Sequence, residues 1–431
     1  MQNVSAPPRP AAPPPVRRVS KRTLTLVVVL LVVPWLAALS LFNGGKLFHR
    51  AARLKVGAPA PAAPGGRVFL AATGPWGTLE CTRIALEVPR EFIFTSLPQM
   101  DQPVWHFNGW SREAVAKLFE GAELTPGQRA SLFERSNWDV TAAGVKVHPE
   151  PALILGLSAT SRERIYTVLT KYWENEVQRL AYVFKPELLD ERFEGSELRP
   201  ELIGEVKRLL YRQGKYWMFA DLYSLLGTLH SEAEKQALAK VVSRQWTYLV
   251  RLRVTPEADL DELTAYWSAG GRSKDVRPLL ESLRRLPQGA SLDISHLLTQ
   301  FARRRIYTFP APTADALERR QDCHWTAYNF FSQVPDDRFS DPEVLKKVFA
   351  GEYEKVSGQP RMGDLVVLMN PQGQMLHSAV YVADDLVFCK NGAHFSHPWM
   401  LMKLPDMLDY YLALYQPDHA VLTGYFRRKS G

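Results

Sequence analysis

The feature that most constrains this chain is an apolar run near its N-terminus. Residues 23–42 contain no charged side chain, and about 20 apolar residues suffice for a helix that crosses the hydrocarbon core of a bilayer. Pro34 lies within the run, and a membrane helix tolerates proline better than a soluble helix does. A cleaved signal peptide is the alternative, because small residues at 37–40 lie near the end of the apolar stretch. We expect an uncleaved transmembrane anchor, since the run is long for a signal peptide and a Pro-rich leader precedes it.

The charge of the chain is concentrated beside this anchor. The net charge is +8, but residues 1–55 hold nine Lys or Arg and no Asp or Glu, so the rest of the chain is nearly neutral. A nearly neutral body has no excess charge to attract phosphate groups, and we expect no nucleic-acid partner. Residues 1–22 read as a Pro/Arg-rich leader. Five basic residues precede the apolar run and four follow it, so the charge count barely discriminates between orientations. Because the leader is short, we expect it to stay cytoplasmic, with the C-terminal bulk of the protein exported. Residues 43–66 read as a basic, Pro-rich linker.

The first part of the body, residues 67–149, mixes two patterns. Residues 78–88 carry β-branched side chains in partial alternation, which favours a strand. Ser111 has the side chain of a helix cap, and Thr125-Pro126 combines a cap with proline at the first helical position. We therefore expect a small α+β module.

Two further segments follow this module. Residues 150–305 have apolar positions at helical spacing, for example across 233–252, and we expect a mostly helical region of structural or partner-binding role. Residues 306–431 begin with helical patterns and continue with short strand patterns. The expected fold class is α+β, in a membrane-anchored multidomain chain with a helical middle region.

The three cysteines are too few for a disulfide framework and lack the spacing of zinc ligands. Cys323 differs from Cys81 and Cys389 in its surroundings. Asp322 is a good helix cap, so we expect a helix from Cys323 to about Ser332 with the sulfur in its first turn. The free backbone N–H groups of a first turn stabilise a thiolate. A thiol nucleophile also needs a base, and histidine is the side chain whose unperturbed pKa suits that task.

Strand patterns follow this helix. Short apolar runs at 365–369, 375–382 and 386–389 are separated by turn-forming residues. His377 lies in the second run, 54 positions after Cys323. This order predicts a nucleophile at a helix start that faces a base on a strand.

These motifs resemble, in their order and spacing, the NlpC-type papain-fold cysteine peptidases. The resemblance rests on the Asp-Cys pair that ends at Cys323, the Gly-Asp-Leu-Val sequence at 363–366 and the His-x-x-x-Tyr sequence that begins at His377. It implies that residues 306–431 form a papain-like domain, with Cys323 as nucleophile and His377 as base. The family cleaves amide bonds in bacterial cell-wall peptides. The resemblance therefore implies a peptide-like amide substrate of that kind. Together with the expected anchor at 23–42, it indicates a single-pass protein of the bacterial inner membrane.

The same resemblance implies a polar residue that orients the imidazole from the next strand. Asn391 is the best chemical candidate, and His394 is the second choice. The His394-x-x-His397 pair lacks the carboxylates and the helical setting of a metalloprotease, and the chain shows no phosphate loop or dinucleotide fingerprint. We therefore expect neither a metal nor a cofactor.

Three more residues are expected to line the site. They are the cap Asp322, Tyr307 in a predicted short strand at 305–309, and Trp325, which stands where relatives carry a small residue. The groove beside the nucleophile should therefore differ in shape from that of the family. This departure leaves two alternatives open: another thiol amidase or acyltransferase on the same fold, or a catalytically degenerate domain in an interaction protein.

Overall fold

The computed structural model describes residues 68–93, 103–311, 321–415 and 420–429. The chain separates into two units, residues 1–61 and 62–431, and every described residue belongs to the second unit. The expected leader, the anchor at 23–42 and the linker lie outside the described residues. Within the described ranges, no helix combines the length and the apolar character that crossing a membrane requires.

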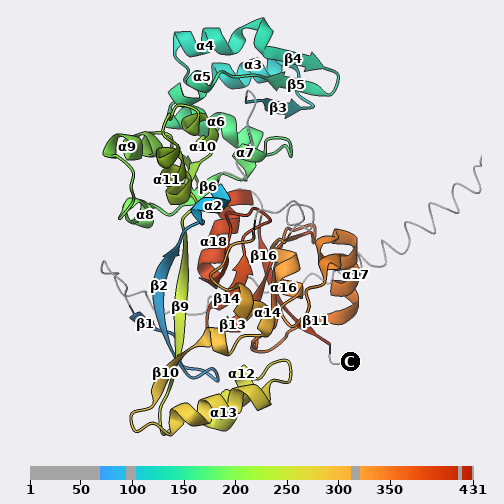
Figure 1. The fold of residues 1–431 in the computed structure, drawn as a ribbon. Coiled ribbons are helices and arrows are strands. Elements are labelled where there is room, and N and C mark those ends of the chain that lie inside the picture. Colours follow the sequence, from blue (N-terminus) through green and yellow to red (C-terminus); the bar gives the residue numbers. More distant parts are fainter. Residues whose placement is uncertain (1–67, 94–102, 312–320, 416–419, 430–431) are drawn as a thin grey trace, which may run out of the picture. The chain divides into compact units, whose positions relative to one another are not determined.

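The strands of the described part form four antiparallel sheets (Figure 1). The N-terminal sheet has the order β1-β2-β9-β10, with strands Val68–Leu70, Thr78–Leu86, Gln245–Val254 and Ala290–Asp293. The C-terminal sheet has the order β11-β16-β12-β13-β14-β15, with strands Tyr353–Lys355, Leu422–Arg428, Leu365–Met369, Met375–Ala383, Leu386–Lys390 and Trp399–Lys403. Two smaller sheets are β3-β5-β4, formed by Trp105–Asn108, Gly144–Val147 and Trp138–Thr141, and β6-β8-β7, formed by Tyr182–Phe184, Tyr216–Phe219 and Tyr211–Gln213.

Helices accompany every sheet. From the N-terminal side to the middle of the chain they are α2 Arg90–Ile93, α3 Arg112–Glu120, α4 Pro126–Phe133, α5 Pro151–Gly156, α6 Ala159–Leu169, α7 Glu176–Arg179, α8 Leu189–Phe193, α9 Pro200–Arg208, α10 Leu222–Leu226 and α11 Glu232–Val242. They continue with α12 Leu260–Trp267, α13 Ser273–Arg284, α14 Gln300–Arg305, α16 Cys323–Tyr328, α17 Pro342–Glu352 and α18 Leu404–Tyr415. Short 3-10 turns are η1 Arg135–Asn137, η2 Pro186–Leu188, η3 Ile294–His296 and η4 Asp337–Ser340. The fold class is α+β, as the sequence predicts.

Local capping signals placed two helices correctly. The Ser111 side chain accepts a hydrogen bond from the backbone N–H of Ala114 and caps α3. Thr125 and Gln128 form a reciprocal capping box at the start of α4, with Pro126 in the first turn. Both helix starts are therefore confirmed, because they depend only on neighbouring residues.

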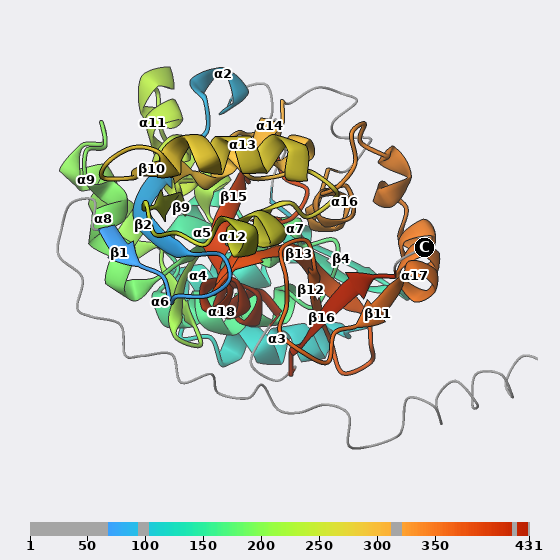
Figure 2. The same cartoon turned by 90° about the horizontal axis from the view of Figure 1, so that it is seen from below.

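The expected helix across 233–252 is wrong beyond Val242, where α11 ends. Residues 245–254 form β9 instead, which pairs with β2 from Thr78↔Arg253 to Leu86↔Gln245. The aromatic and β-branched residues of this stretch fit a pleated strand, and pairing with a partner far away in the sequence decides between the two structures. The middle region thus contributes strands as well as helices. Beyond β9, α12 and α13 lie side by side, and α13 contacts both β9 and β10 (Figures 1 and 2).

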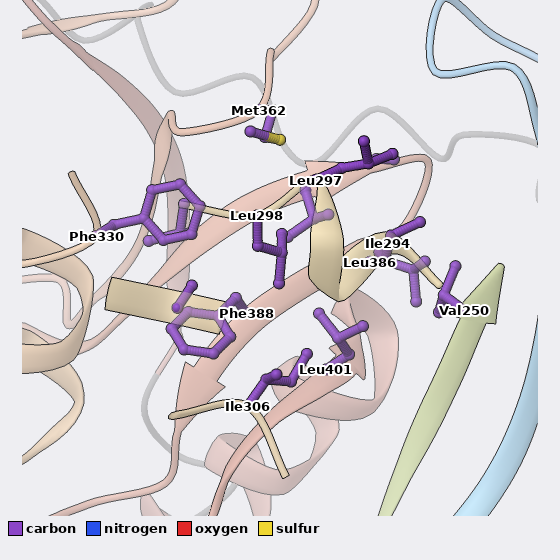
Figure 3. Packing of buried hydrophobic residues seen from close by; sticks show 14 of the residues in the cluster. Val250, Ile294, Leu297, Leu298, Ile306, Phe330, Met362, Leu386, Phe388 and Leu401 are labelled. Atoms are coloured by element: carbon purple, nitrogen blue, oxygen red, sulfur yellow. The ribbon is translucent and has the colours of Figure 1, made fainter. Parts of the chain in front are cut away.

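One hydrophobic core joins the N-terminal sheet to the C-terminal sheet. Val250 of β9 packs in the same cluster as Phe388 of β14 and Leu401 of β15 (Figure 3). The hydroxyl of Thr247 in β9 also donates to the backbone carbonyl of Leu401, at 2.9 Å. The core therefore crosses residue 306, where the sequence suggested a boundary between segments.

The C-terminal sheet has a helix-covered core on each face. Alternating side chains of β13 point to opposite faces. Val380 and Val382 belong to the cluster that contains Trp325 and Ala327 of α16, and this defines the α16 face. The residues that alternate with them, Ala379 and Tyr381, belong to the cluster that contains Met407 and Tyr411 of α18, and this defines the α18 face. This alternation decides which side chains of β13 each helix meets.

The predicted strand at 305–309 is wrong. Arg305 ends α14, and Tyr307 has a positive φ of 64°, which a regular strand does not accommodate. The backbone still exchanges two hydrogen bonds with Trp399 of β15, from Tyr307 N–H at 2.7 Å and to the carbonyl of Thr308 at 3.0 Å. The segment therefore joins the sheet edge without continuing it.

Candidate active site

Cys323 begins α16, as the sequence predicts. Asp322 caps this helix through its Oδ1 atom, which accepts a hydrogen bond from the backbone N–H of Trp325 at 2.9 Å. The helix ends at Tyr328, short of the expected Ser332. A helix of six residues has only a weak dipole, so the stabilisation of a thiolate has to come from neighbouring side chains.

The early end of α16 has a local cause in Asn329. The side-chain amide of this residue donates to the carbonyls of Trp325, at 3.0 Å, and Asp336, at 3.1 Å. Its Oδ1 atom accepts from the backbone N–H of Asp336 at 2.7 Å. These bonds fold the chain back after one and a half turns, and single-sequence helix patterns do not register such a contact.

Two imidazoles act on the thiol of Cys323, which is 5% exposed. Burial opposes ionisation of this thiol, but the charges of His324 and His377, together with their side-chain interactions with the sulfur, hold the pKa of Cys323 well below its ordinary value. The thiolate in turn outweighs the effect of burial on His324 and raises the pKa of that imidazole to about 9. The structure thus brings together the predicted Cys323 and His377, and it adds His324, which the sequence reasoning treated only as part of the departure from the family.

His324 is held by a residue that the sequence reasoning missed. The Nδ1 atom of His324 lies 2.9 Å from the hydroxyl oxygen of Ser378 on β13. Ser378 is fully buried and lies on the α16 face of the sheet, since its neighbours Val380 and Val382 pack against α16. No local signal marks this residue, because the contact depends on how α16 packs on β13.

His377 has a different environment. It lies on β13 opposite Leu368 of β12, and it is fully buried. Its ring stacks on Tyr411 of α18, with 4.1 Å between the ring centroids and 27° between the planes. Among the described residues, neither ring nitrogen of His377 has a hydrogen-bond partner. Stacking therefore fixes the plane of a buried ring whose nitrogens no other described residue engages by a hydrogen bond.

The expected orienting residues do not reach His377 through any hydrogen bond found in the described part. The Asn391 side chain donates to the sulfur of Met402 at 3.3 Å, and its Oδ1 atom lies 4.0 Å from the sulfur of Cys389. The Nδ1 atom of His394 lies 2.6 Å from the hydroxyl of Ser396. Asn391 is therefore engaged with β14 and β15, and His394 with its own loop.

A buried lysine lies at the end of β14, next to this loop. Lys390 is fully buried, and its ammonium group donates to the carbonyls of Gly392, at 2.6 Å, and His394, at 3.0 Å. Burial lowers the pKa of Lys390 to about 7, although the charges of Asp322 and Cys323 act in the opposite direction. Burial and then the charge of Cys323 raise the pKa of Asp322 to about 6. The thiol therefore belongs to a buried cluster of mixed charge.

Tyr307 and Trp325 are engaged in packing. The hydroxyl of Tyr307 donates to the carbonyl of Tyr248 on β9, at 2.7 Å. Trp325 is 1% exposed, packs against Phe301 with 5.3 Å between ring centroids, and donates its indole N–H to Asp337 at 3.1 Å. The side chain that stands in place of the family's small residue thus fills the core beneath α16.

The thiols of the other two cysteines have raised pKa values, in contrast to that of Cys323. Burial raises the pKa of Cys81 to about 12, and burial followed by the charge of Cys323 raises the pKa of Cys389. All three thiols are unpaired. Cys323 is therefore the cysteine of this chain that its surroundings favour as a thiolate.

No protein-family model, curated protein or solved structure matches the chain. A cavity of about 650 Å³ lies elsewhere in the described part, between Tyr266 of α12 and the segment 354–361 that precedes β12, and none of the residues around Cys323 lines it. The cluster of Cys323 with its two imidazoles is therefore the site from which a function can be argued.

Proposed function

We propose that this chain is a membrane-anchored thiol hydrolase that cleaves amide bonds, with Cys323 as nucleophile and His377 as base. The observation that carries the proposal is the contrast among three buried thiols. The pKa of Cys323 is held well below its ordinary value by imidazoles, whereas burial raises the pKa of Cys81 and Cys389. A thiolate is the reactive form of cysteine, and selective activation of one thiol is typical of a nucleophile.

The chemistry follows from this cluster. The thiolate attacks the amide carbonyl, a C–S bond forms, the C–N bond breaks, and the leaving nitrogen takes a proton from His377. A water molecule then gives a proton to His377 and attacks the thioester carbonyl, so that the C–S bond breaks and the thiolate is restored. No hydrogen bond to another described residue holds the ring nitrogens of His377, which leaves them uncommitted for this exchange of protons.

The order of elements supports a papain-like domain of the NlpC type. A helix that begins with the cysteine packs on an antiparallel sheet, and the histidine lies on a strand of that sheet. The motifs around Cys323, Gly363 and His377 occur in the order of that family. On this basis we assign the substrate to peptides of the bacterial cell wall, which an exported domain anchored through residues 23–42 would meet outside the inner membrane.

A second candidate is a catalytically degenerate domain in an interaction protein. It is favoured by the 5% exposure of Cys323, which leaves little of the sulfur open to a substrate. The two candidates differ in one outcome, because only the enzyme produces a new product.

The test is incubation of the full-length protein, in detergent micelles, with purified cell-wall peptide fragments, followed by mass spectrometry of the products. Cys323→Ala removes the proposed nucleophile, and Cys389→Ala is the matched control for loss of a buried thiol on the neighbouring strand. We expect cleavage by the wild type and by Cys389→Ala, and none by Cys323→Ala. Cleavage that survives in Cys323→Ala would contradict the proposal, and no cleavage by the wild type would favour the degenerate domain.

A further inference from the structure

We propose that His324 is a second catalytic residue, which holds the thiolate of Cys323 as an ion pair, and that Ser378 is the residue that positions it. This inference rests on the proposed function and deepens it. It concerns one proton transfer in the free protein: the S–H bond of Cys323 breaks, and an N–H bond forms at Nε2 of His324. When the thiolate attacks, this proton passes from His324 to His377, which gives it to the leaving nitrogen. The proton that His377 later takes from water returns to His324 as the thiolate is restored.

Ser378 stabilises the charged form of His324. The hydroxyl oxygen of Ser378 forms a hydrogen bond with Nδ1 of His324, at 2.9 Å. In the imidazolium both ring nitrogens carry protons, and the hydroxyl oxygen of Ser378 accepts the hydrogen bond from Nδ1–H. The proton that leaves Cys323 is then carried at Nε2, and the bond to Ser378 favours this charged form.

Consecutive residues of β13 serve the two imidazoles that act on the thiol. Ser378 holds His324 on the α16 face, whereas the adjacent His377 stacks on Tyr411 of α18. A strand that presents consecutive residues to opposite faces can serve Cys323 through both without either competing for space. Ser378 therefore has the role that the sequence assigned to Asn391, but toward a different histidine.

Charged and titratable groups around the sulfur of Cys323 also support the ion pair. The titratable groups that act on the cluster come from the start of α16, from β13 and from the end of β14: Asp322, His324, His377, Cys389 and Lys390. Asp322 raises the pKa of His324, so it supports the charged imidazolium. Removing the hydroxyl of Ser378 removes none of these charged groups. A change in the pKa of Cys323 would therefore report the lost positioning of the His324 imidazole.

The test is the pH dependence of alkylation of Cys323 by iodoacetamide in the full-length protein, with mass spectrometry of the modified peptide. Ser378→Ala removes the acceptor, and Ser378→Thr restores a hydroxyl. Ser396→Ala is the matched control, because its hydroxyl lies 2.6 Å from Nδ1 of His394 in the same kind of pair. We expect Ser378→Ala to raise the apparent pKa of Cys323 and to slow alkylation at low pH about 10- to 100-fold. Ser378→Thr should lie close to the wild type, and Ser396→Ala should leave the profile unchanged.

Two results distinguish failure of the positioning role of Ser378 from failure of the proposed function. A low apparent pKa of Cys323 in the wild type that Ser378→Ala leaves unchanged would overturn the positioning role and leave the proposed function standing. An ordinary thiol pKa in the wild type would overturn the proposed function itself. His324→Gln keeps the inference falsifiable if Ser378→Ala does not fold: it should raise the apparent pKa of Cys323, and an unchanged profile would overturn the ion pair.

Discussion

Replacing Asp322 by asparagine separates the two roles of this residue. As the cap of α16, its Oδ1 atom accepts from the backbone N–H of Trp325 at 2.9 Å. As a carboxylate, it is buried beside the thiolate of Cys323, and both effects raise its pKa to about 6. Asparagine keeps the acceptor and removes the charge. Asp322→Asn should therefore preserve the cap of α16 and remove the repulsion between the buried carboxylate and the thiolate of Cys323.

The magnitude follows from the shift in the pKa of Asp322. An acid whose pKa is higher in the folded state binds more protons than the unfolded chain does between the two pKa values, so the free energy of unfolding falls as the pH rises through that window. The pKa of Asp322 rises from 3.8 to about 6. The loss between about pH 4 and about pH 6 is therefore on the order of 2–3 kcal/mol, and Asp322→Asn should not show it.

The assay is urea denaturation of the wild type and of Asp322→Asn across this pH range. The variant should match the wild type at about pH 4 and be more stable than it above about pH 6. Asp341→Asn is the matched control, because Asp341 caps α17 by accepting from the backbone N–H of Glu343 at 2.8 Å. Asp322→Ala, which also removes the cap, should cost about 1 kcal/mol relative to Asp322→Asn. A stability difference between Asp322→Asn and the wild type that does not change with pH would refute the reasoning.

Three further predictions concern catalysis, stability and location. Substituting both Cys323 and His377 by alanine should reduce turnover little more than either substitution alone, because the two act as one unit; additive losses in kinetic assays would contradict this. Asp221→Ala removes the partner of the fully buried Arg162 and should lower the free energy of unfolding by about 3–5 kcal/mol in urea denaturation. Asp336→Ala breaks a surface pair with Arg338 and should lower it by about 1 kcal/mol or less. Residues 23–42 should keep the protein in the membrane fraction, and a C-terminal reporter that works only after export should be active; an expressed but inactive reporter would indicate a cytoplasmic C-terminus.

The elements around the site were predictable where local chemistry decides them. The cap Asp322 gave the start of α16 at Cys323. Turn-forming residues on either side gave strands β12, β13 and β14 to within one residue of their observed ends. These features depend on residues that lie within a few positions of one another, which is the range over which sequence patterns are informative.

The remainder depends on contacts between distant residues. Residues 245–254 read as helical until β2 pairs with them. The bond between His324 and Ser378 spans 54 positions and requires α16 to pack on the matching face of β13. Lys390 lies in a strand whose five residues are all buried, so its burial breaks the usual rule for a charged side chain. A search for titratable residues within apolar strands would have singled out this lysine.

The most direct test of the central claim is an ultraviolet titration of the Cys323 thiolate. Thiolates absorb where thiols do not, so the difference in absorbance between the wild type and Cys323→Ala reports the charge of this one sulfur, whatever its exposure. If the thiolate of Cys323 is stabilised, we expect a difference that is already present at about pH 6 and stays constant up to about pH 8, whereas free cysteine ionises near pH 8.5. A difference that appears only above about pH 8 would show an ordinary thiol and contradict the assignment of Cys323 as nucleophile.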